Sequence, residues 1–277
     1  MSDAQAVVLE GVEFRYPGGR LHLVVPDLRI ARGEMTAIVG PNGSGKTTLL
    51  KLLCGLLRAE RGRLEVRGVD PARTRRRDFA RSVALVTPAV TLGFGYSALE
   101  VVLMGRAPHV EGFRLESDRD LAAAARAMRA TDVLALGDQP YDTLSSGERQ
   151  RVSVARALAQ EPEILLLDEP AAFLDIKQQT VLYDLLAELN QRDGLTIVSV
   201  LHDLNLASLY FERVAMLREG HLHSVGTPAE VITYQSIREV FDTDVYVDIN
   251  DLTGSMNVLP LSRRAGEMAK IKKGSGH

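Results

Sequence analysis

Residues 40 to 48 read Gly40-Pro41-Asn42-Gly43-Ser44-Gly45-Lys46-Thr47-Thr48, which fits the pattern G-x-x-x-x-G-K-[ST]. A short apolar run, Met35 to Val39, precedes this stretch, and a segment with helical spacing, Thr47 to Leu57, follows it. Glycine at positions 43 and 45 lets successive backbone N–H groups turn toward a phosphate without a Cβ in the way. The N-terminus of the next helix points at the same anion. The order of strand, loop and helix therefore predicts a phosphate-binding loop, called here the phosphate loop (40–48).

Two carboxylates follow a second apolar run, Ile164 to Leu167. A buried parallel strand that ends in Asp168 can hold the Mg²⁺ of a phosphate-loop site, together with the hydroxyl of Thr47. Lys46 is expected to reach the β- and γ-phosphates, and Glu169 is placed to polarise a water for in-line attack. A strand that ends in a solvated acidic turn explains the run alone equally well, but the phosphate loop favours the metal site.

A third stretch, Leu144-Ser145-Ser146-Gly147-Glu148, begins a predicted helix that continues over Arg149 to Ala159. It is either a simple helix cap or a second helix N-terminus that binds an anion. One nucleotide cannot use both helix ends unless a second copy of the chain supplies one of them, so the pattern suggests a dimer. His202 follows another apolar strand, Thr196 to Val200, and is either a packing residue or a contact for the γ-phosphate or the attacking water.

Composition limits the class of protein. The chain has 277 residues, of which 45% are apolar and 25% charged, as in globular proteins. Its net charge of −3 argues against a protein whose main function is to bind nucleic acid. Cys54 is the single cysteine, which excludes an intramolecular disulfide. The N-terminus lacks a signal-peptide pattern, and Pro88, Gly93 and Gly95 interrupt the longest uncharged stretch, so we expect a soluble, cytosolic protein.

The order of secondary structure predicts an α/β fold with a mainly parallel sheet, because short apolar strands alternate with helical segments along the chain. Two further strands are expected near the N-terminus, over Val7 to Tyr16 and Leu21 to Ile30. A region of helical character extends from Leu99 to Arg129. The last twenty or so residues lose periodicity, and residues 256–277 are expected to form a flexible tail after a domain that covers residues 1–255.

Taken together, these motifs resemble the ATP-binding subunit of an ABC transporter, over roughly residues 5 to 245. The resemblance implies a P-loop NTPase cassette with a mainly parallel core sheet, an antiparallel β region at the N-terminus and a helical subdomain inserted over roughly residues 90–160. The five-residue stretch at 144–148 matches the signature sequence that is specific to this family.

The resemblance assigns functional residues one by one. Tyr16 matches the aromatic side chain that stacks on adenine, and Asp168 and Glu169 match the Walker B aspartate and the catalytic carboxylate. Asp175 matches the D-loop aspartate and His202 the switch histidine. The nucleotide-binding positions are Tyr16, Gly40, Asn42, Gly43, Ser44, Gly45, Lys46, Thr47, Thr48, Ser145, Ser146, Gly147 and Asp175.

Within the family, two stretches resemble those of subunits that import ferric siderophores, haem or cobalamin. They are Leu103 to His109 and Val200 to Asn205. The resemblance implies ATP as substrate with Mg²⁺, a homodimer at the cytoplasmic face of the inner membrane, and two permease subunits. A periplasmic or surface binding protein supplies the cargo, and no nucleic acid is involved. Leu92 to Met104, with Phe94, Tyr96, Leu99 and Val102, looks like the groove that faces the permease; packing in the core is the alternative.

Three positions depart from the family pattern. Ser146 stands where glycine is usual, and Ala171 where threonine or serine is common. The larger departure is the missing Q-loop glutamine, since no Gln occurs between Gln5 and Gln139. Ala89 or Pro88 occupies its place, depending on the alignment, and neither side chain can bind Mg²⁺ or orient a water.

Other functions stay open at this point. The missing glutamine suits a cassette that binds ATP as a regulatory or structural switch with little turnover, although Glu169 and His202 oppose this. A soluble, non-transport ABC ATPase usually has two cassettes or a long coiled-coil insert, and neither is present. The run of Arg73, Arg75, Arg76 and Arg77 suggests RNA binding, but a solvated helix face explains it better.

Overall fold

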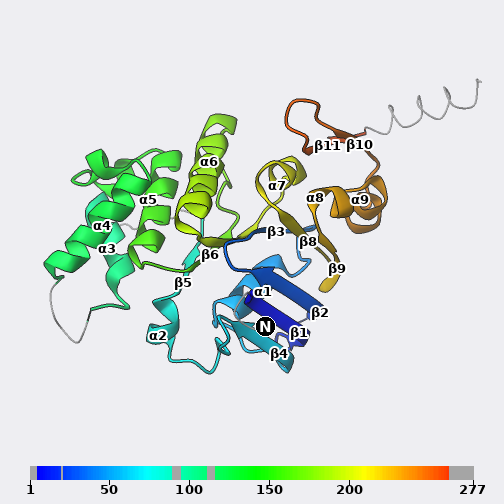
Figure 1. Cartoon of the computed structure of the whole chain (residues 1–277), viewed down its shortest axis with the longest axis horizontal. Helices are drawn as coiled ribbons and strands as arrows, with labels where there is room; N and C mark the ends of the chain where they lie inside the picture. The colour runs from blue at the N-terminus through cyan, green and yellow to red at the C-terminus, as the bar shows by residue number, and fades with distance from the viewer. Residues whose placement is uncertain (1–4, 20, 89–94, 111–115, 262–277) are drawn as a thin grey trace, which may run out of the picture.

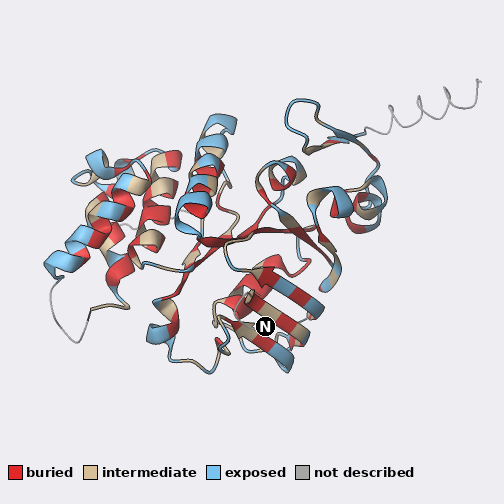
Figure 2. Cartoon of the chain, in the orientation of Figure 1, coloured by how far each residue is buried: buried red, intermediate tan, exposed pale blue. Residues whose placement is uncertain are grey.

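The N-terminal strands form the antiparallel part of a large sheet in this computed structural model, which describes residues 5–19, 21–88, 95–110 and 116–261. Strand β1 (Gln5–Arg15) pairs antiparallel with β2 (His22–Ala31) on one side and with β4 (Arg61–Val66) on the other. Buried residues tend to alternate with more exposed ones along β1 and β2, as expected for strands with one covered face (Figure 2). The antiparallel region predicted near the N-terminus is confirmed.

The core of the same sheet is parallel. Its nine strands run in the order β4-β1-β2-β9-β8-β3-β7-β6-β5, and parallel pairs join β8 to β3 and then β7, β6 and β5. The bounds of these strands are β3 (Met35–Val39), β5 (Val83–Val86), β6 (Ile164–Asp168), β7 (Thr196–Val200), β8 (Arg213–Arg218) and β9 (His221–Gly226). All residues of β3 and β7 are buried, which explains why these strands are mostly apolar, with only small hydroxyl residues among them.

Helices cover both faces of this sheet (Figure 1). On one face, α1 (Lys46–Leu53) packs in a core with Ile38, Ile164 and Val198. On the other face lie α6 (Ile176–Asp193), α7 (Leu204–Tyr210), α8 (Pro228–Val231) and α9 (Tyr234–Phe241). The shorter α2 (Arg76–Ala80) precedes β5. The structure therefore confirms the α/β class and the mainly parallel core sheet.

A group of helices with its own apolar core stands beside the sheet (Figure 1). It contains α3 (Ala98–Leu103), η1 (Met104–Arg106), α4 (Asp118–Ala130), η2 (Leu134–Leu136), η3 (Tyr141–Thr143) and α5 (Ser146–Ala159). Ser97, Ser117 and Ser145 each begin a helix with a capping box, which satisfies N–H groups that lack partners within the helix. The helical character predicted for Leu99 to Arg129 is thus divided between α3, η1 and α4.

Arg106, one residue after a closely packed glycine, ties these helices together from inside. Its side chain is 1% exposed and its Nε donates to Asp120 Oδ1 at 2.9 Å. Its Nη1 donates to the carbonyl oxygen of Ala159 at 2.6 Å and to Glu161 Oε2 at 2.9 Å. Hydrogen bonds from Ser117 and Arg106 lower the pKa of Asp120 to about 2. One guanidinium therefore joins η1, the start of α4 and the end of α5.

Replacing Arg106 with alanine should lower the free energy of unfolding by about 3 kcal/mol, because Asp120 then keeps a mostly buried charge without its partner. The depressed pKa of Asp120 stabilises the fold above its ordinary value of 3.8, and this contribution is lost as the pH falls toward 2. Urea unfolding at pH 7 and at pH 3 measures both effects. Arg126→Ala is the control, since Arg126 contacts Glu161 from a side chain that is 57% exposed; an equal loss in both variants would contradict the buried role.

The C-terminal part differs from the sequence-based division at residue 255. Strands β10 (Val245–Ile249) and β11 (Met256–Pro260) form an antiparallel hairpin, so the predicted tail begins too early. Val258 is buried, and its backbone N–H donates to Asn205 Oδ1 at 2.7 Å, which attaches the hairpin to α7. Residues 262–277 of the predicted tail lie outside the described residues. Among the described residues, no helix combines the length and apolar character needed to cross a bilayer.

Candidate active site

The phosphate loop curls around the side chain of Lys46, the first residue of α1. Lys46 is buried, and its Nζ donates to the carbonyl oxygens of Gly40 at 2.8 Å and Pro41 at 3.0 Å. Gly45, in the left-handed region at φ 104°, turns the chain into the helix. Burial lowers the pKa of Lys46, and the charges of Glu169 and Asp168 oppose this shift. The ammonium group of Lys46 thus lies inside the loop, and the charges of the two carboxylates favour its protonated form.

Thr47 and Asp168 meet although they lie on separate elements. Thr47 Oγ1 donates to Asp168 Oδ1 at 3.1 Å, which brings the first turn of α1 to the end of β6. Burial raises the pKa of Asp168, and the hydrogen bond from Thr47 opposes that shift. Both donors are hard oxygens, and two adjacent ligands of octahedral Mg²⁺ lie about 3 Å apart. The pair therefore fits the predicted metal position.

Glu169 and His202 contact each other at the next position along the strand ends. His202 Nε2 lies 2.6 Å from Glu169 Oε1, because β6 and β7 are parallel neighbours with Asp168 opposite Val200. Glu169 adopts φ 49°, a conformation that non-glycine residues rarely hold outside constrained sites. The two side chains line a hollow of about 220 Å³ and are one third and about one half exposed. A carboxylate held in this way can accept a proton from a water that enters the hollow.

Tyr16 lies close to the same helix on the side of the antiparallel strands. Its hydroxyl is 3.4 Å from Thr48 Oγ1, and its ring packs edge-on against Phe14 with centroids 4.9 Å apart. The ring is half-buried, so one part stays accessible. An aromatic side chain next to the phosphate loop offers a stacking surface for a base.

The signature residues lie on the helical group, away from α1 of the same chain (Figure 1). Ser145 begins α5 and its Oγ donates to Glu148 Oε2 at 2.7 Å, while Ser145 and Ser146 are exposed. A Cβ on Gly147 would come 2.1 Å from Gln178 Oε1, so α5 and α6 approach closely here. Asp175 begins α6 and accepts a hydrogen bond from the backbone N–H of Gln178 at 2.8 Å. Gln178, which the sequence analysis missed, therefore touches both the signature and the D-loop.

Two apolar side chains next to Asp175 are almost fully solvent-exposed. Phe173 is 94% exposed at φ 66°, and Ile176 is 84% exposed. Large apolar side chains that stand out in this way mark contact surfaces when they cluster beside a functional site.

The sequence-based groove over Leu92 to Met104 is only partly supported. Val102 is fully buried in the core of the helical group and Leu99 packs against it, so these two are packing residues. Tyr96 and Met104 are 39% and 40% exposed. Phe94 lies outside the described residues, as does Ala89, whereas Pro88 is described and partly buried just after β5.

Comparisons with known proteins show which family the chain belongs to. The family model described as ABC transporter matches residues 24–172. A hemin import ATP-binding protein, HmuV, of Myxococcus xanthus is 42% identical over 80% of this chain and 84% of its own length. The ferric enterobactin transport ATP-binding protein FepC of Escherichia coli is 38% identical over 87% of this chain and 89% of its own length.

Solved structures show the same fold. An inward-facing ABC transporter described as metal-chelate type superposes with a TM-score of 0.83 at 27% identity, covering 94% of this chain and 99% of that one. The dimeric ATP-binding cassette MJ0796, bound to ADP and Pi, superposes with a TM-score of 0.68 at 27% identity, covering 80% of this chain and 98% of that one. The family match and these identities show that the chain belongs to the ABC transporter family, as an ATP-hydrolysing subunit.

Proposed function

We propose that this chain powers the import of an iron chelate, haem above all, or of cobalamin, through a membrane permease. The observation that carries the proposal is the pair of contacts at the strand ends: Thr47 with Asp168 at 3.1 Å, and Glu169 with His202 at 2.6 Å. Lys46 supplies a phosphate contact, Thr47 and Asp168 a metal position, and Glu169 a base. These residues lie at the start of α1 and at the end of β6. This is the equipment that phosphoryl transfer to water requires.

The proposed mechanism divides nucleotide binding and hydrolysis among the residues of the site. Lys46 and the backbone N–H groups of the phosphate loop bind the β- and γ-phosphates, and Tyr16 stacks on the base. Glu169 accepts the proton of the attacking water, and His202 holds the Glu169 carboxylate in place and contacts the γ-phosphate. Mg²⁺, when held by Thr47 and Asp168, would neutralise charge on the phosphates.

A homodimer completes the site in this proposal. Ser145, Ser146 and Gly147 lie at the N-terminus of α5, where Ser145 and Ser146 are exposed, yet this helix end lies apart from the phosphate loop of its own chain (Figure 1). Phe173 and Ile176 supply an exposed apolar contact beside Asp175. The second copy therefore places its signature residues on the γ-phosphate, and Phe173 lies in the contact between the copies.

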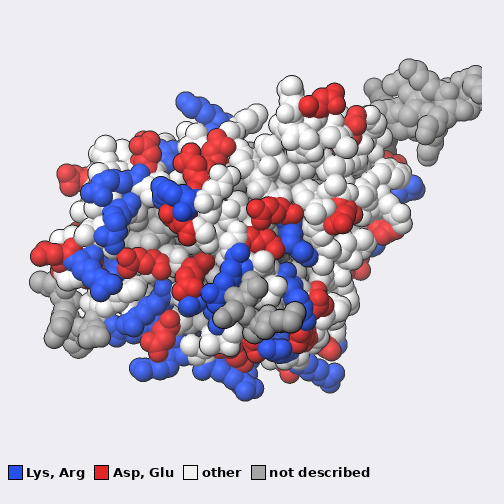
Figure 3. All heavy atoms as spheres, viewed as in Figure 1, with Lys and Arg blue, Asp and Glu red and all other residues white. Residues whose placement is uncertain are grey.

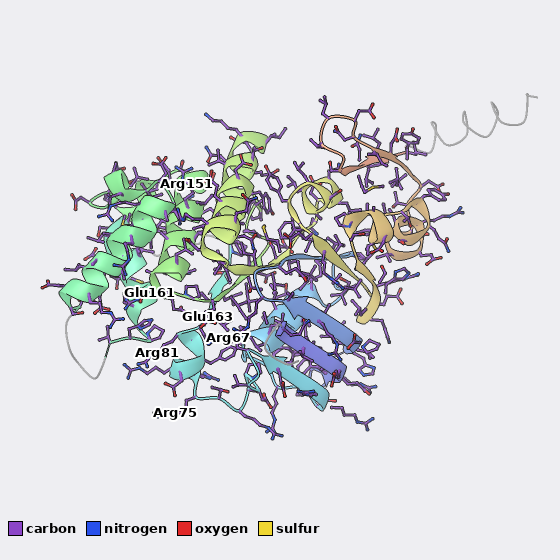
Figure 4. All side chains as sticks on the ribbon, in the orientation of Figure 1. Arg67, Arg75, Arg81, Arg151, Glu161 and Glu163 are labelled. Atoms are coloured by element: carbon purple, nitrogen blue, oxygen red, sulfur yellow. The ribbon has the colours of Figure 1, made fainter. Side chains whose placement is uncertain are left out.

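The permease contact is proposed at a hollow of about 300 Å³ between the end of α1 and α2. Leu56, 54% exposed, Phe79 and Leu85 line it, and Arg76 borders it. Exposed basic side chains continue along α2, where Figure 4 places Arg75 and Arg81, and basic residues collect along the lower edge of the molecule in Figure 3. Such a surface suits a short cytoplasmic loop of a permease, and so a position at the inner face of the membrane.

The names of the relatives support the proposed cargo. Those that are 42% and 43% identical to this chain are named for hemin import, and those at 38% and 37% for ferric enterobactin and cobalamin. Reconstitution with a permease that co-purifies with this chain, followed by uptake of haem, a ferric siderophore and cobalamin, tests the choice. ATP-dependent uptake of none of the three would contradict the proposal.

The missing glutamine gives a further expected outcome. Mg²⁺ tolerates water as a ligand, so basal ATP hydrolysis should be measurable but slow, and cargo-loaded binding protein should stimulate it poorly. Ala89→Gln should raise the stimulated rate more than the basal rate, and the other alignment predicts the same gain for Pro88→Gln. Both variants are assayed in the reconstituted transporter. A wild type with no turnover above that of Glu169→Gln would favour the regulatory switch over the importer.

A further inference from the structure

A two-residue turn, Glu219-Gly220, connects the antiparallel strands β8 and β9. Both residues have positive φ angles, 48° and 84°, and Arg218 pairs with His221 across the turn. These are the features of the type I′ turn that joins two strands most tightly. A Cβ on Gly220 would lie 2.0 Å from the carbonyl oxygen of His22, so glycine is required here both by its conformation and by the close approach of β2.

The backbone of Gly220 bonds in two directions. Its N–H donates to the carbonyl oxygen of Ser44, in the phosphate loop, at 3.0 Å. Its carbonyl oxygen accepts from the N–H of Val24 in β2 at 2.7 Å. Val24 opposite His221 is the single register pair between β2 and β9 among the described residues. The turn thus lies where the antiparallel part, the parallel core and the phosphate loop meet (Figure 1).

The phosphate loop rests directly against this junction. A Cβ on Gly40 would come 2.2 Å from the carbonyl oxygen of Leu217, the residue before last in β8. A Cβ on Gly45 would come 2.9 Å from Leu23 Cδ1 in β2. Ser44 itself is 2% exposed, and its carbonyl oxygen is bonded to the N–H of Gly220, so the buried middle of the loop is attached to the turn.

We infer that the Glu219-Gly220 turn is a positioning element for the phosphate loop and sets its affinity for nucleoside triphosphates. Anion binding by a loop of this kind depends on several backbone N–H groups that converge on one phosphate. The hydrogen bond from Gly220 holds the middle of the loop, at Ser44, from behind. This inference rests on the proposed role of the phosphate loop in ATP binding.

The experiment compares Gly220→Ala with Gly68→Ala. Gly68 also follows a residue with positive φ, in a turn after β4 at the edge of the sheet, and a Cβ there would meet nothing within 4 Å. We expect Gly220→Ala to raise the dissociation constants of both MgATP and MgGTP about tenfold and by the same factor. The substitution displaces the phosphate loop, which binds the phosphates that both nucleotides share. Gly68→Ala should lower the melting temperature without changing either constant.

Hydrogen exchange on the wild type provides a test that needs no substitution. Addition of MgADP should slow amide exchange in a peptide spanning residues 217–222 together with the phosphate loop, and leave the β10–β11 hairpin unchanged. Equal affinities in the two glycine variants, a loss confined to ATP, or unchanged exchange at 217–222 would each overturn the inference. If Lys46→Ala also left ATP affinity unchanged, the role of the phosphate loop itself would fail, so the two failures are distinguishable.

Discussion

Replacing Glu169 with glutamine should leave ATP bound and lower its hydrolysis by about 10²- to 10⁴-fold, the usual contribution of a positioned base. An amide oxygen can still accept a hydrogen bond from His202, so the geometry at 2.6 Å is retained. The amide cannot take a proton from water, and the reaction stops with ATP in place. Phosphate release at saturating MgATP measures the rate, and calorimetry measures the binding.

The stalled Glu169→Gln variant should also accumulate as a dimer, visible by light scattering after size exclusion in MgATP. Adding Phe173→Asp to this variant should return it to a monomer, because a charge then replaces an exposed apolar contact. Glu163→Gln is the matched control, because Glu163 lies just before the start of β6, at the opposite end of that strand from Glu169. Its side chain is 54% exposed and pairs with Arg67 at 2.6 Å, and Figure 4 labels both residues. Full turnover in Glu169→Gln would remove the proposed base, and a monomer at every concentration would remove the shared site.

Replacing Lys46 with alanine should weaken ATP binding by about 3 kcal/mol, or roughly 100-fold, since a charge-assisted contact to two phosphates is lost. The loss includes the two hydrogen bonds by which Lys46 holds the carbonyl oxygens of Gly40 and Pro41. Titration calorimetry with MgATP on wild type and variant gives the difference directly.

Lys51→Ala provides the control for charge, because Lys51 lies in the last turn of the same helix and also acts on Asp168 from a distance. We expect it to change the affinity about twofold at most, as a screened charge does. Unchanged affinity in Lys46→Ala would show that the phosphate loop does not bind the nucleotide. Equal losses in both variants would point to general charge rather than to a contact.

The elements that could be predicted from the sequence are those with a strong local pattern. Buried parallel strands are mostly apolar runs, so Ile164 to Leu167 and Thr196 to Val200 were recognisable without any partner strand. Strand β4 was missed because three of its six residues, Arg61, Gly62 and Arg63, are exposed and break the pattern. Helix α6 begins at Ile176, and its start depends on the Asp175 cap and not on apolar spacing.

The candidate site followed from the sequence as a set of residues, but the contacts among them did not. Nothing local in the sequence states that Thr47 reaches Asp168, or that Glu169 takes a left-handed conformation to face His202. These contacts depend on strand order, which is set by packing across the whole sheet. The bond from Gly220 to Ser44 has the same origin, because a Glu-Gly turn in a hairpin has no visible link to a loop far earlier in the chain.

Strand order also has a consequence for synthesis on the ribosome. Strands β1, β2 and β4 pair within the first 66 residues, so the nascent chain can form this part early. Among the described strands, β3 pairs with β7 and β8, Met35 opposite Ile197 and Val39 opposite Met216, and it must wait for both to emerge. Until then a strand that is fully buried in the folded protein lacks its neighbours, the kind of intermediate that aggregates and that chaperones protect. The nucleotide pocket is therefore completed late in folding. ATP can bind and stabilise the folded chain, but it cannot stabilise the early intermediates.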